Sequence, residues 1–187
     1  MSRVRYDRLP TEQPHPRNRD LDRLSPEQLI TRMNREDARV VRAVARSRGP
    51  IARAIELIAH GLQCGGRLFF LGAGTSGRLG VIEAAECPPT FHTPASLVQA
   101  FIAGGRRAVF RSQEGAEDRA ADARRLVRRR VRIGDVVVGI AASGVTPFVE
   151  LGLKTAKAKR AATVLITCHP RARALRLRLT PWALGAA

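Results

Sequence analysis

A glycine-rich turn of six residues has the composition of a phosphate-binding site. Residues 68–71 form a continuous apolar run typical of a buried strand, and Gly72-Ala73-Gly74-Thr75-Ser76-Gly77 follows it. A helix that begins here would present free backbone N–H groups and its positive dipole end to an anion. Glycine lets the backbone approach a ligand closely, and small hydroxyls add donors. The candidate phosphate-binding residues of this turn are Gly74, Thr75, Ser76 and Gly77; a glycine turn that binds nothing is the alternative.

Two kinds of nucleotide site fit this turn poorly. A nucleotide-phosphate P-loop requires a lysine after its last glycine, but Arg78 occupies that position. The three glycines match the dinucleotide pattern G-x-G-x-x-G, which by itself is a weak signal. That site also needs an acidic residue after the next strand, whereas residues 97–102 lead into Ala103-Gly104-Gly105. We therefore expect a phosphorylated small molecule rather than a nucleotide.

A second turn repeats the same combination of glycine and small hydroxyls. Residues 141–146 follow the strongly apolar segment 135–140, and they contain Ser143, Gly144 and Thr146. In a parallel sheet the turns after the strands lie at one edge, so both turns should meet there. Two such turns suit a sugar phosphate better than one does.

Acidic residues near these turns are candidates for proton transfer. Glu83 and Glu86 follow the first turn, and Glu114, Glu117 and Asp118 precede an arginine-rich segment. Two carboxylates can serve as acid and base when their surroundings separate their pKa values. Spacing alone leaves a second interpretation open, in which the later acids only decorate a helix N-terminus.

The elements that position these residues alternate along the chain. The predicted strands are 68–71, 97–102, 135–140 and 163–167, and the predicted helices between them include 117–130 and 147–159. The helix that follows the glycine-rich turn should end near Glu86, because Pro88 disfavours helical backbone at the residue before it. This alternation predicts an α/β fold with a parallel sheet between helices.

The N-terminal part is predicted to be a polar arm followed by helices. Residues 1–24 form the arm, and Ser25 begins a helix with Gln28 completing a capping box. A break is expected at Gly49-Pro50. The residues expected to form the inward apolar faces of these helices are Leu29, Ile30, Met33, Val40, Val41, Val44, Ile51, Ile55, Ile58 and Leu62.

Composition limits the class of protein. The chain has 187 residues, enough for one domain with an appendage, and contains neither a long apolar span nor an N-terminal apolar leader. Cys64, Cys87 and Cys168 are an odd number at wide spacing, so we expect free thiols in the cytoplasm and no metal site. The net charge of +17 is typical of nucleic-acid binders, but only 4% of residues are aromatic and no recognition motif is present. We therefore do not expect nucleic acid or a membrane as the main partner.

Four segments resemble the N-acetylmuramic acid 6-phosphate etherase family. They are LGAGTSGRLGVIEAAECPPTF, IAGG, EGAED and DVVVGIAASG. This family has a sugar isomerase (SIS) fold, a flavodoxin-like three-layer sandwich, and is related to the glucokinase regulatory protein. The resemblance runs from about Leu9 to Pro170 and implies a C-terminally truncated member. It implies an N-terminal arm with helices over 1–48, an incomplete SIS-type domain over 49–170 and a divergent basic tail over 171–187.

The resemblance implies a lyase reaction that needs no metal or organic cofactor. Members cleave the D-lactyl ether of N-acetylmuramic acid 6-phosphate to N-acetylglucosamine 6-phosphate and D-lactate, in amino-sugar and cell-wall recycling. Elimination across C2–C3 of the open-chain aldehyde is followed by addition of water. In the family the active site is shared between two subunits, which implies a homodimer if the fold is completed.

Matched motifs assign roles to individual residues. The resemblance implies that Glu86 is the proton donor and Glu117 the second catalytic acid/base, with Glu86 buried against apolar neighbours so that its pKa is raised. The residues implied to hold the 6-phosphate are Thr75, Ser76, Ser143 and Thr146, supported by Gly74, Gly77 and Gly144. Val145 and His92 depart from the family, which usually has arginine and a small residue at these positions. The alternatives are a non-catalytic sugar-phosphate-binding regulator or an inactive fragment of the etherase.

Overall fold

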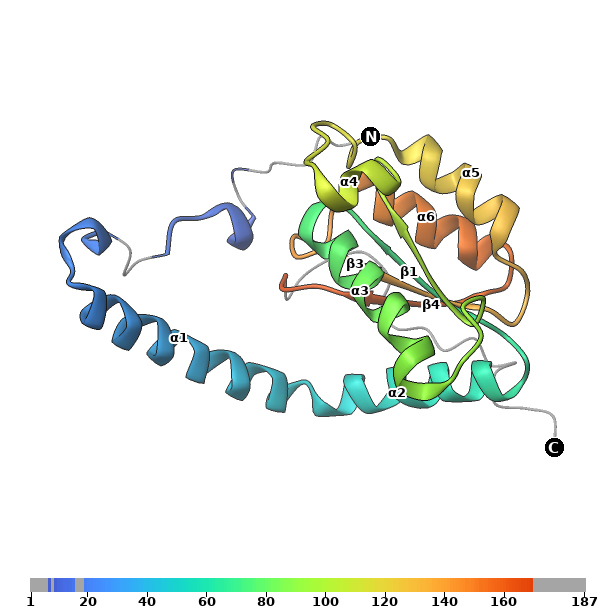
Figure 1. Cartoon of the computed structure of the whole chain (residues 1–187), viewed down its shortest axis with the longest axis horizontal. Coiled ribbons are helices and arrows are strands. Elements are labelled where there is room, and N and C mark those ends of the chain that lie inside the picture. Colours follow the sequence, from blue (N-terminus) through green and yellow to red (C-terminus); the bar gives the residue numbers. More distant parts are fainter. Residues whose placement is uncertain (1–6, 8, 16–18, 170–187) are drawn as a thin grey trace.

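The computed structural model describes residues 7, 9–15 and 19–169. Its centre is a parallel sheet of four strands in the order β2-β1-β3-β4 (Figure 1). The strands are β1 Leu68–Gly72, β2 Val98–Ile102, β3 Val136–Ile140 and β4 Ala162–Ile166. The predicted parallel α/β fold is confirmed, and each strand lies within two residues of its predicted position. The predicted tail from residue 171 on lies outside the described residues.

Alternating side chains of the central strands fill two separate cores. Phe69, Leu71 and Val137 are buried on one face of the sheet, with the Phe69 ring stacked on Phe101. Leu68 and Val136 are buried on the other face. Because helices cover both faces, β1 and β3 are apolar throughout and do not alternate with polar residues.

Helices form the outer layers of a three-layer sandwich. Helices α5 Ala120–Arg130 and α6 Pro147–Ala158 pack on one face of the sheet. Helices α2 Arg48–Gln63 and α3 Gly74–Phe91 pack on the other. The short helix α4 Arg106–Phe110 follows β2 beside the first turn of α3 (Figure 1).

A long helix precedes the sandwich. The short 3-10 helices η2 Pro10–Glu12 and η3 Leu21–Arg23 lead into α1 Pro26–Arg46. The predicted capping box is confirmed, because the Ser25 hydroxyl accepts from the Gln28 N–H and the Gln28 side chain accepts from the Ser25 N–H. Arg32 of α1 hydrogen-bonds Asp20 at 2.6 Å and lowers the pKa of that carboxyl.

The predicted break at Gly49-Pro50 is wrong, because the helices separate two residues earlier, at Ser47. Pro50 lies in the first turn of α2 and does not interrupt it. Backbone N–H groups of a first turn have no partner within the helix, so proline costs little there.

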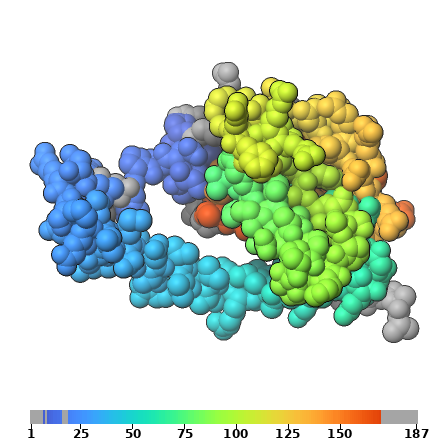
Figure 2. Space-filling view, in the orientation of Figure 1, coloured from blue at the N-terminus to red at the C-terminus, as the bar shows by residue number. Residues whose placement is uncertain are grey.

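The predicted inward faces of the first helices are also largely wrong. On α1, the side chains of Ile30, Met33, Val40, Val41 and Val44 are between 53% and 70% exposed. The prediction failed because α1 extends away from the sheet (Figure 1), and Figure 2 shows open space between its surface and the α/β body.

On α2 the side chains that pack against the core lie from Ala54 onward. Ile51 and Ile55 are exposed, whereas Leu57 is buried and both Ile58 and Leu62 pack against the core. The predicted core-facing stripe is therefore correct for its last two members and wrong for its first two.

Helix α3 continues beyond the prolines that were expected to end it. It runs through Pro88 and Pro89 to Phe91, and His92 then adopts a left-handed conformation with φ of 54°. Proline has a helical φ, so the backbone can follow the helix although two hydrogen-bond donors are lost.

None of the helices in the described part of the chain combines the length and the apolar character that a membrane span requires.

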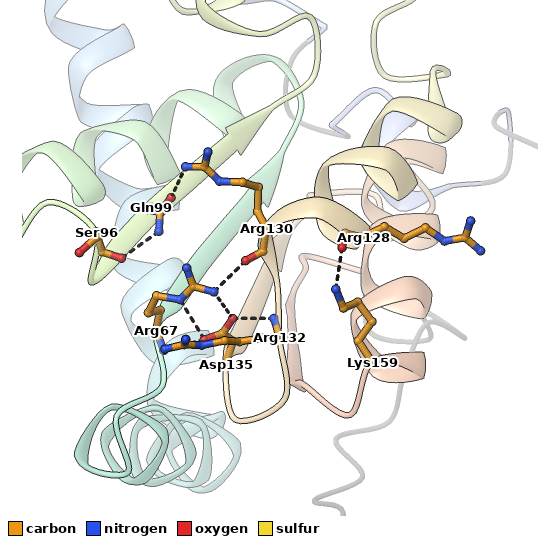
Figure 3. Close-up of polar contacts among 8 residues, drawn as sticks. All are labelled: Arg67, Ser96, Gln99, Arg128, Arg130, Arg132, Asp135 and Lys159. Atoms are coloured by element: carbon orange, nitrogen blue, oxygen red, sulfur yellow. Dashed lines mark hydrogen bonds and ion pairs between the residues drawn. The ribbon is translucent and has the colours of Figure 1, made fainter.

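An ion pair closes the sheet edge where the strands begin. Asp135 is fully buried and accepts hydrogen bonds from the guanidinium and backbone N–H of Arg67 and from the backbone N–H of Arg132 (Figure 3). Arg67 also donates to the Arg130 carbonyl and lies over the Phe69 ring, 4.9 Å from its centroid. These contacts fix the amino ends of β1 and β3 and leave the opposite edge for a site.

Candidate functional site

A pocket of about 320 Å³ lies at the edge where the parallel strands end. Ligand pockets typically enclose roughly 300–1,000 Å³, so this one is large enough for a small molecule. The pocket is lined by Ala73, Gly74, Arg78, Ala103, Ala108, Ser112, Gln113, Glu114, Ala116, Glu117 and Thr146.

The turn between β1 and α3 is built by close backbone packing. A Cβ on Gly72 would lie 2.7 Å from the Gly77 nitrogen, and one on Gly77 would lie 2.6 Å from the Ile102 side chain. Gly74 has a φ of +53°, which favours glycine. Helix α3 begins at Gly74, and the preceding Ala73 makes no side-chain cap. Its first-turn N–H groups are therefore oriented toward the pocket wall that Ala73 and Gly74 form.

The start of α6 supplies another wall. Thr146 is the N-cap of α6, yet its side chain makes no capping hydrogen bond. The Phe148 N–H in the first turn of α6 donates instead to the Glu117 carbonyl, at 2.9 Å. This bond ties the loop before α5 to the start of α6 and brings Glu117 and Thr146 to one pocket.

Arg78 lines the pocket and was missed as a site residue by the sequence analysis. Its Nε donates to the Val109 carbonyl at the end of α4, at 2.8 Å. It follows Gly74 by four residues on α3, and residues four apart share a helix face. That spacing was the signal that could have identified Arg78.

The structure brings together only some of the predicted site residues. Gly74, Glu117 and Thr146 line the pocket. The predicted residues that lie in the same turns but outside the pocket lining are Thr75, Ser76, Gly77, Ser143 and Gly144. The Ser143 hydroxyl accepts a local hydrogen bond from the Val145 N–H, at 3.4 Å.

Glu86 lies apart from the pocket within the single chain. It follows Gly74 by twelve residues on the same helix, which corresponds to about 18 Å along the helix axis. Its side chain is exposed, so the burial expected for Glu86 is not found in this chain. Its catalytic role, like that of Glu117, stays a prediction.

The arrangement can hold an anion beside two carboxylates. The N-termini of α3 and α6 each add about half a positive charge, and Arg78 adds a full one. Glu114 and Glu117 place carboxylates at the same pocket, where the Ser112 hydroxyl donates to Glu114 at 3.0 Å. The helix N-termini and Arg78 provide the donors and positive charge that a phosphate group would need.

Solved structures with the same fold include two phosphoheptose isomerases. The chain superposes on phosphoheptose isomerase GmhA from Neisseria gonorrhoeae with a TM-score of 0.57 and 23% identity, covering 74% of each chain. For the phosphoheptose isomerase from Francisella tularensis the TM-score is 0.55 and the identity 18%, covering 77% of this chain and 75% of that one. At this identity, the likeness shows the fold.

Sequence relatives carry the name N-acetylmuramic acid 6-phosphate etherase. The protein from Rippkaea orientalis is 52% identical over 163 residues, which are 87% of this chain and 53% of that protein. The protein from Synechocystis sp. is 50% identical over 167 residues, 89% of this chain and 55% of that protein. The chain thus spans about half the length of these relatives, and the resemblance drawn from its motifs is confirmed.

A family model, the glucokinase regulatory protein N-terminal SIS domain, matches residues 50–157. This range covers strands β1 to β3, helices α3 to α5 and most of α2 and α6, and it ends before β4. The chain therefore belongs to the family of SIS domains represented by the N-terminal domain of the glucokinase regulatory protein.

Proposed function

We propose that this protein is an etherase that releases D-lactate from N-acetylmuramic acid 6-phosphate and leaves N-acetylglucosamine 6-phosphate. The observation that carries the proposal is a pocket that holds Glu117 beside the N-termini of α3 and α6. About 50% identity to relatives with this name supports it. The expected setting is amino-sugar recycling in the cytoplasm.

The proposed reaction is an elimination followed by a hydration. In the open-chain sugar the aldehyde acidifies the C2 proton, which a carboxylate removes while the C3–O bond to lactate breaks. The lactate alkoxide is a poor leaving group and takes a proton from an acid. Water then adds across the C2–C3 double bond, its hydroxyl to C3 and its proton to C2. We assign the acid to Glu86 and the second proton-transfer step to Glu117, and the 6-phosphate to the two turns.

A lactate-release assay tests this assignment. Glu117→Gln should lower D-lactate release by about 10²–10⁴-fold, the usual contribution of a general acid or base. Binding of the sugar phosphate should persist, because the amide keeps the size of the side chain. Asp118→Asn is the matched control, since Asp118 is an exposed neighbour outside the pocket lining and should not matter. Normal turnover by Glu117→Gln would remove Glu117 from the mechanism, and no lactate from the unaltered chain would refute the activity.

We further propose a homodimer in which the second copy completes the site. Glu86 is exposed and outside the pocket of its own chain, so a catalytic Glu86 must act on the pocket of another copy. The exposed apolar residues of α1 give the second copy a surface to cover. Such stripes are typical of association sites in soluble proteins.

Mixing two inactive variants tests the shared site. Glu86→Gln and Glu117→Gln should each be inactive alone. In a mixed dimer one site carries both changes and the other carries neither, so an equilibrated mixture should recover about a quarter of the unaltered activity. No recovery from a mixture that forms mixed dimers would contradict a shared site. Glu83→Gln is the control for Glu86, because it lies one turn earlier on the same exposed helix surface.

A non-catalytic regulator that binds sugar phosphates is the second candidate. It is favoured by the match to the glucokinase regulatory protein domain and by the exposure of Glu86. A chain that binds N-acetylglucosamine 6-phosphate but releases no lactate as a dimer would support this candidate over the etherase.

A further inference from the structure

Among the described residues that line the pocket, Arg78 is the only arginine or lysine. The same lining contains Glu114 and Glu117, so the side chains of the pocket sum to one negative charge when all three are ionised. A phosphate ester would add close to two further negative charges. The N-termini of α3 and α6 contribute about half a positive charge each. Together they do not offset the negative charges of the two carboxylates and the ligand.

The position of Arg78 on α3 directs it toward the helix N-terminus. Arg78 and Gly74 are four residues apart and lie on one face of α3. Long side chains on helices lean back toward the preceding turn. The guanidinium of Arg78 is therefore on the same side as the uncapped N–H groups of the first turn, and both line the pocket.

A fixed orientation prepares the guanidinium for an anion. Its Nε–H is held by the Val109 carbonyl at 2.8 Å, and Arg78 is only half-buried. Among the described residues this is the only hydrogen bond of the Arg78 side chain, so its terminal N–H groups stay available. Guanidinium groups bind phosphate oxygens with two parallel hydrogen bonds, and a guanidinium held in place loses less entropy when it does so.

From these observations we infer that Arg78 binds the phosphate of the substrate together with the first turn of α3. This inference rests on the proposed function, because it assigns a residue to the phosphate of that substrate. It also gives α4 a role, since α4 carries the carbonyl that orients Arg78. Arg78 offsets the carboxylates of Glu114 and Glu117, which would otherwise repel a phosphate ester.

The test compares three variants in calorimetric titrations with N-acetylglucosamine 6-phosphate, after circular dichroism has shown that each is folded. Arg78→Gln should weaken binding about 10- to 100-fold, the loss expected for a hydrogen bond between charged groups. Arg78→Lys should bind with intermediate affinity, because it keeps the charge but not the paired donors. Arg124→Gln removes the same charge from the exposed surface of α5 and should bind like the unaltered chain.

Unphosphorylated N-acetylglucosamine and inorganic phosphate identify the group that Arg78 recognises. Inorganic phosphate should compete with the sugar phosphate in the unaltered chain and much less in Arg78→Gln, whereas the unphosphorylated sugar should bind both equally weakly. An unchanged dissociation constant for folded Arg78→Gln would overturn the inference and leave the proposed function standing. Failure of the unaltered chain to bind the sugar phosphate would overturn both.

Discussion

Asp135 shows how a single buried carboxylate determines the geometry of a sheet edge. It accepts four hydrogen bonds, three from Arg67 and one from the Arg132 backbone. Arg67 is held in turn by the Arg130 carbonyl and the Phe69 ring, so the pair connects β1, β3 and the end of α5 (Figure 3). A buried ion pair of this kind has little net value compared with an apolar pair, but the loss of one partner leaves an uncompensated charge.

Asp135→Asn should therefore destabilise the fold strongly. In the variant one carboxylate oxygen becomes an amide N–H₂ group, which cannot accept the hydrogen bonds that Arg67 and Arg132 donate to Asp135. Arg67 would also keep a half-buried charge without a counter-ion. We expect the free energy of unfolding to fall by about 3–5 kcal/mol, measured by urea denaturation. Asp122→Asn breaks the exposed pair with Arg125 and should cost under about 1 kcal/mol. Equal effects of the two variants would contradict the role given to burial.

At the scale of elements, α3 connects the glycine-rich turn after β1 to Glu86, the predicted acid. Its first turn lines the pocket, and its last turns carry Glu86 and the prolines Pro88 and Pro89. Because a helix is rigid over this length, Glu86 cannot approach the pocket of its own chain without unwinding α3. Helix α3 therefore holds Glu86 away from the pocket that its own first turn and Glu117 line.

The end of α3 is strained at His92. A residue with a Cβ in the left-handed region costs roughly 1–2 kcal/mol, and His92 has a φ of 54° at the C-cap. His92→Gly should raise the free energy of unfolding by about 0.5–1 kcal/mol, after the greater entropy of unfolded glycine is deducted. Thermal and urea denaturation measure this change. His92→Ala keeps the Cβ and should give no gain, so stabilisation by alanine would show that strain is not the cause.

At the scale of the whole molecule, the long N-terminal helix α1 has apolar side chains that the rest of the described chain leaves exposed. Helix α1 spans 21 residues, and its apolar residues recur at helical spacing on an exposed surface. Figure 1 and Figure 2 show α1 projecting beyond the sandwich, where a second copy can reach it. The dimer proposed above would remove this apolar surface from water.

Substitution on α1 should shift the proposed dimer toward monomers. Val41 is 70% exposed, and Val41→Glu places a charge in the middle of the apolar surface. Burial of a valine is worth about 1.5–3 kcal/mol, so the dimer dissociation constant should rise at least about tenfold in sedimentation experiments. Ile133→Glu alters an exposed apolar residue in the loop before β3 and serves as the control. A monomeric unaltered chain, or no effect of Val41→Glu, would contradict the proposed interface.

The sequence by itself determined the order and type of the elements, because local patterns encode them. Apolar runs such as residues 136–138 predict buried strands, and Ser25 with Gln28 marks the start of α1. The glycines of the β1–α3 turn predicted a close approach of the backbone to a ligand, which stays a prediction; in the structure Gly72 and Gly77 leave no room for a Cβ because they pack against protein atoms. The motifs around Glu86 and Glu117 indicate the family by themselves, because they are continuous stretches of sequence.

Only the tertiary structure decided which faces are covered and which residues share the pocket. An apolar stripe such as that of Val40, Val41 and Val44 shows that a helix can be covered, but not what covers it. Likewise, Arg78, Glu117 and Thr146 are distant in sequence and meet because parallel strands end at one edge. Contacts between distant segments depend on the packing of whole elements, and local sequence patterns do not specify that packing.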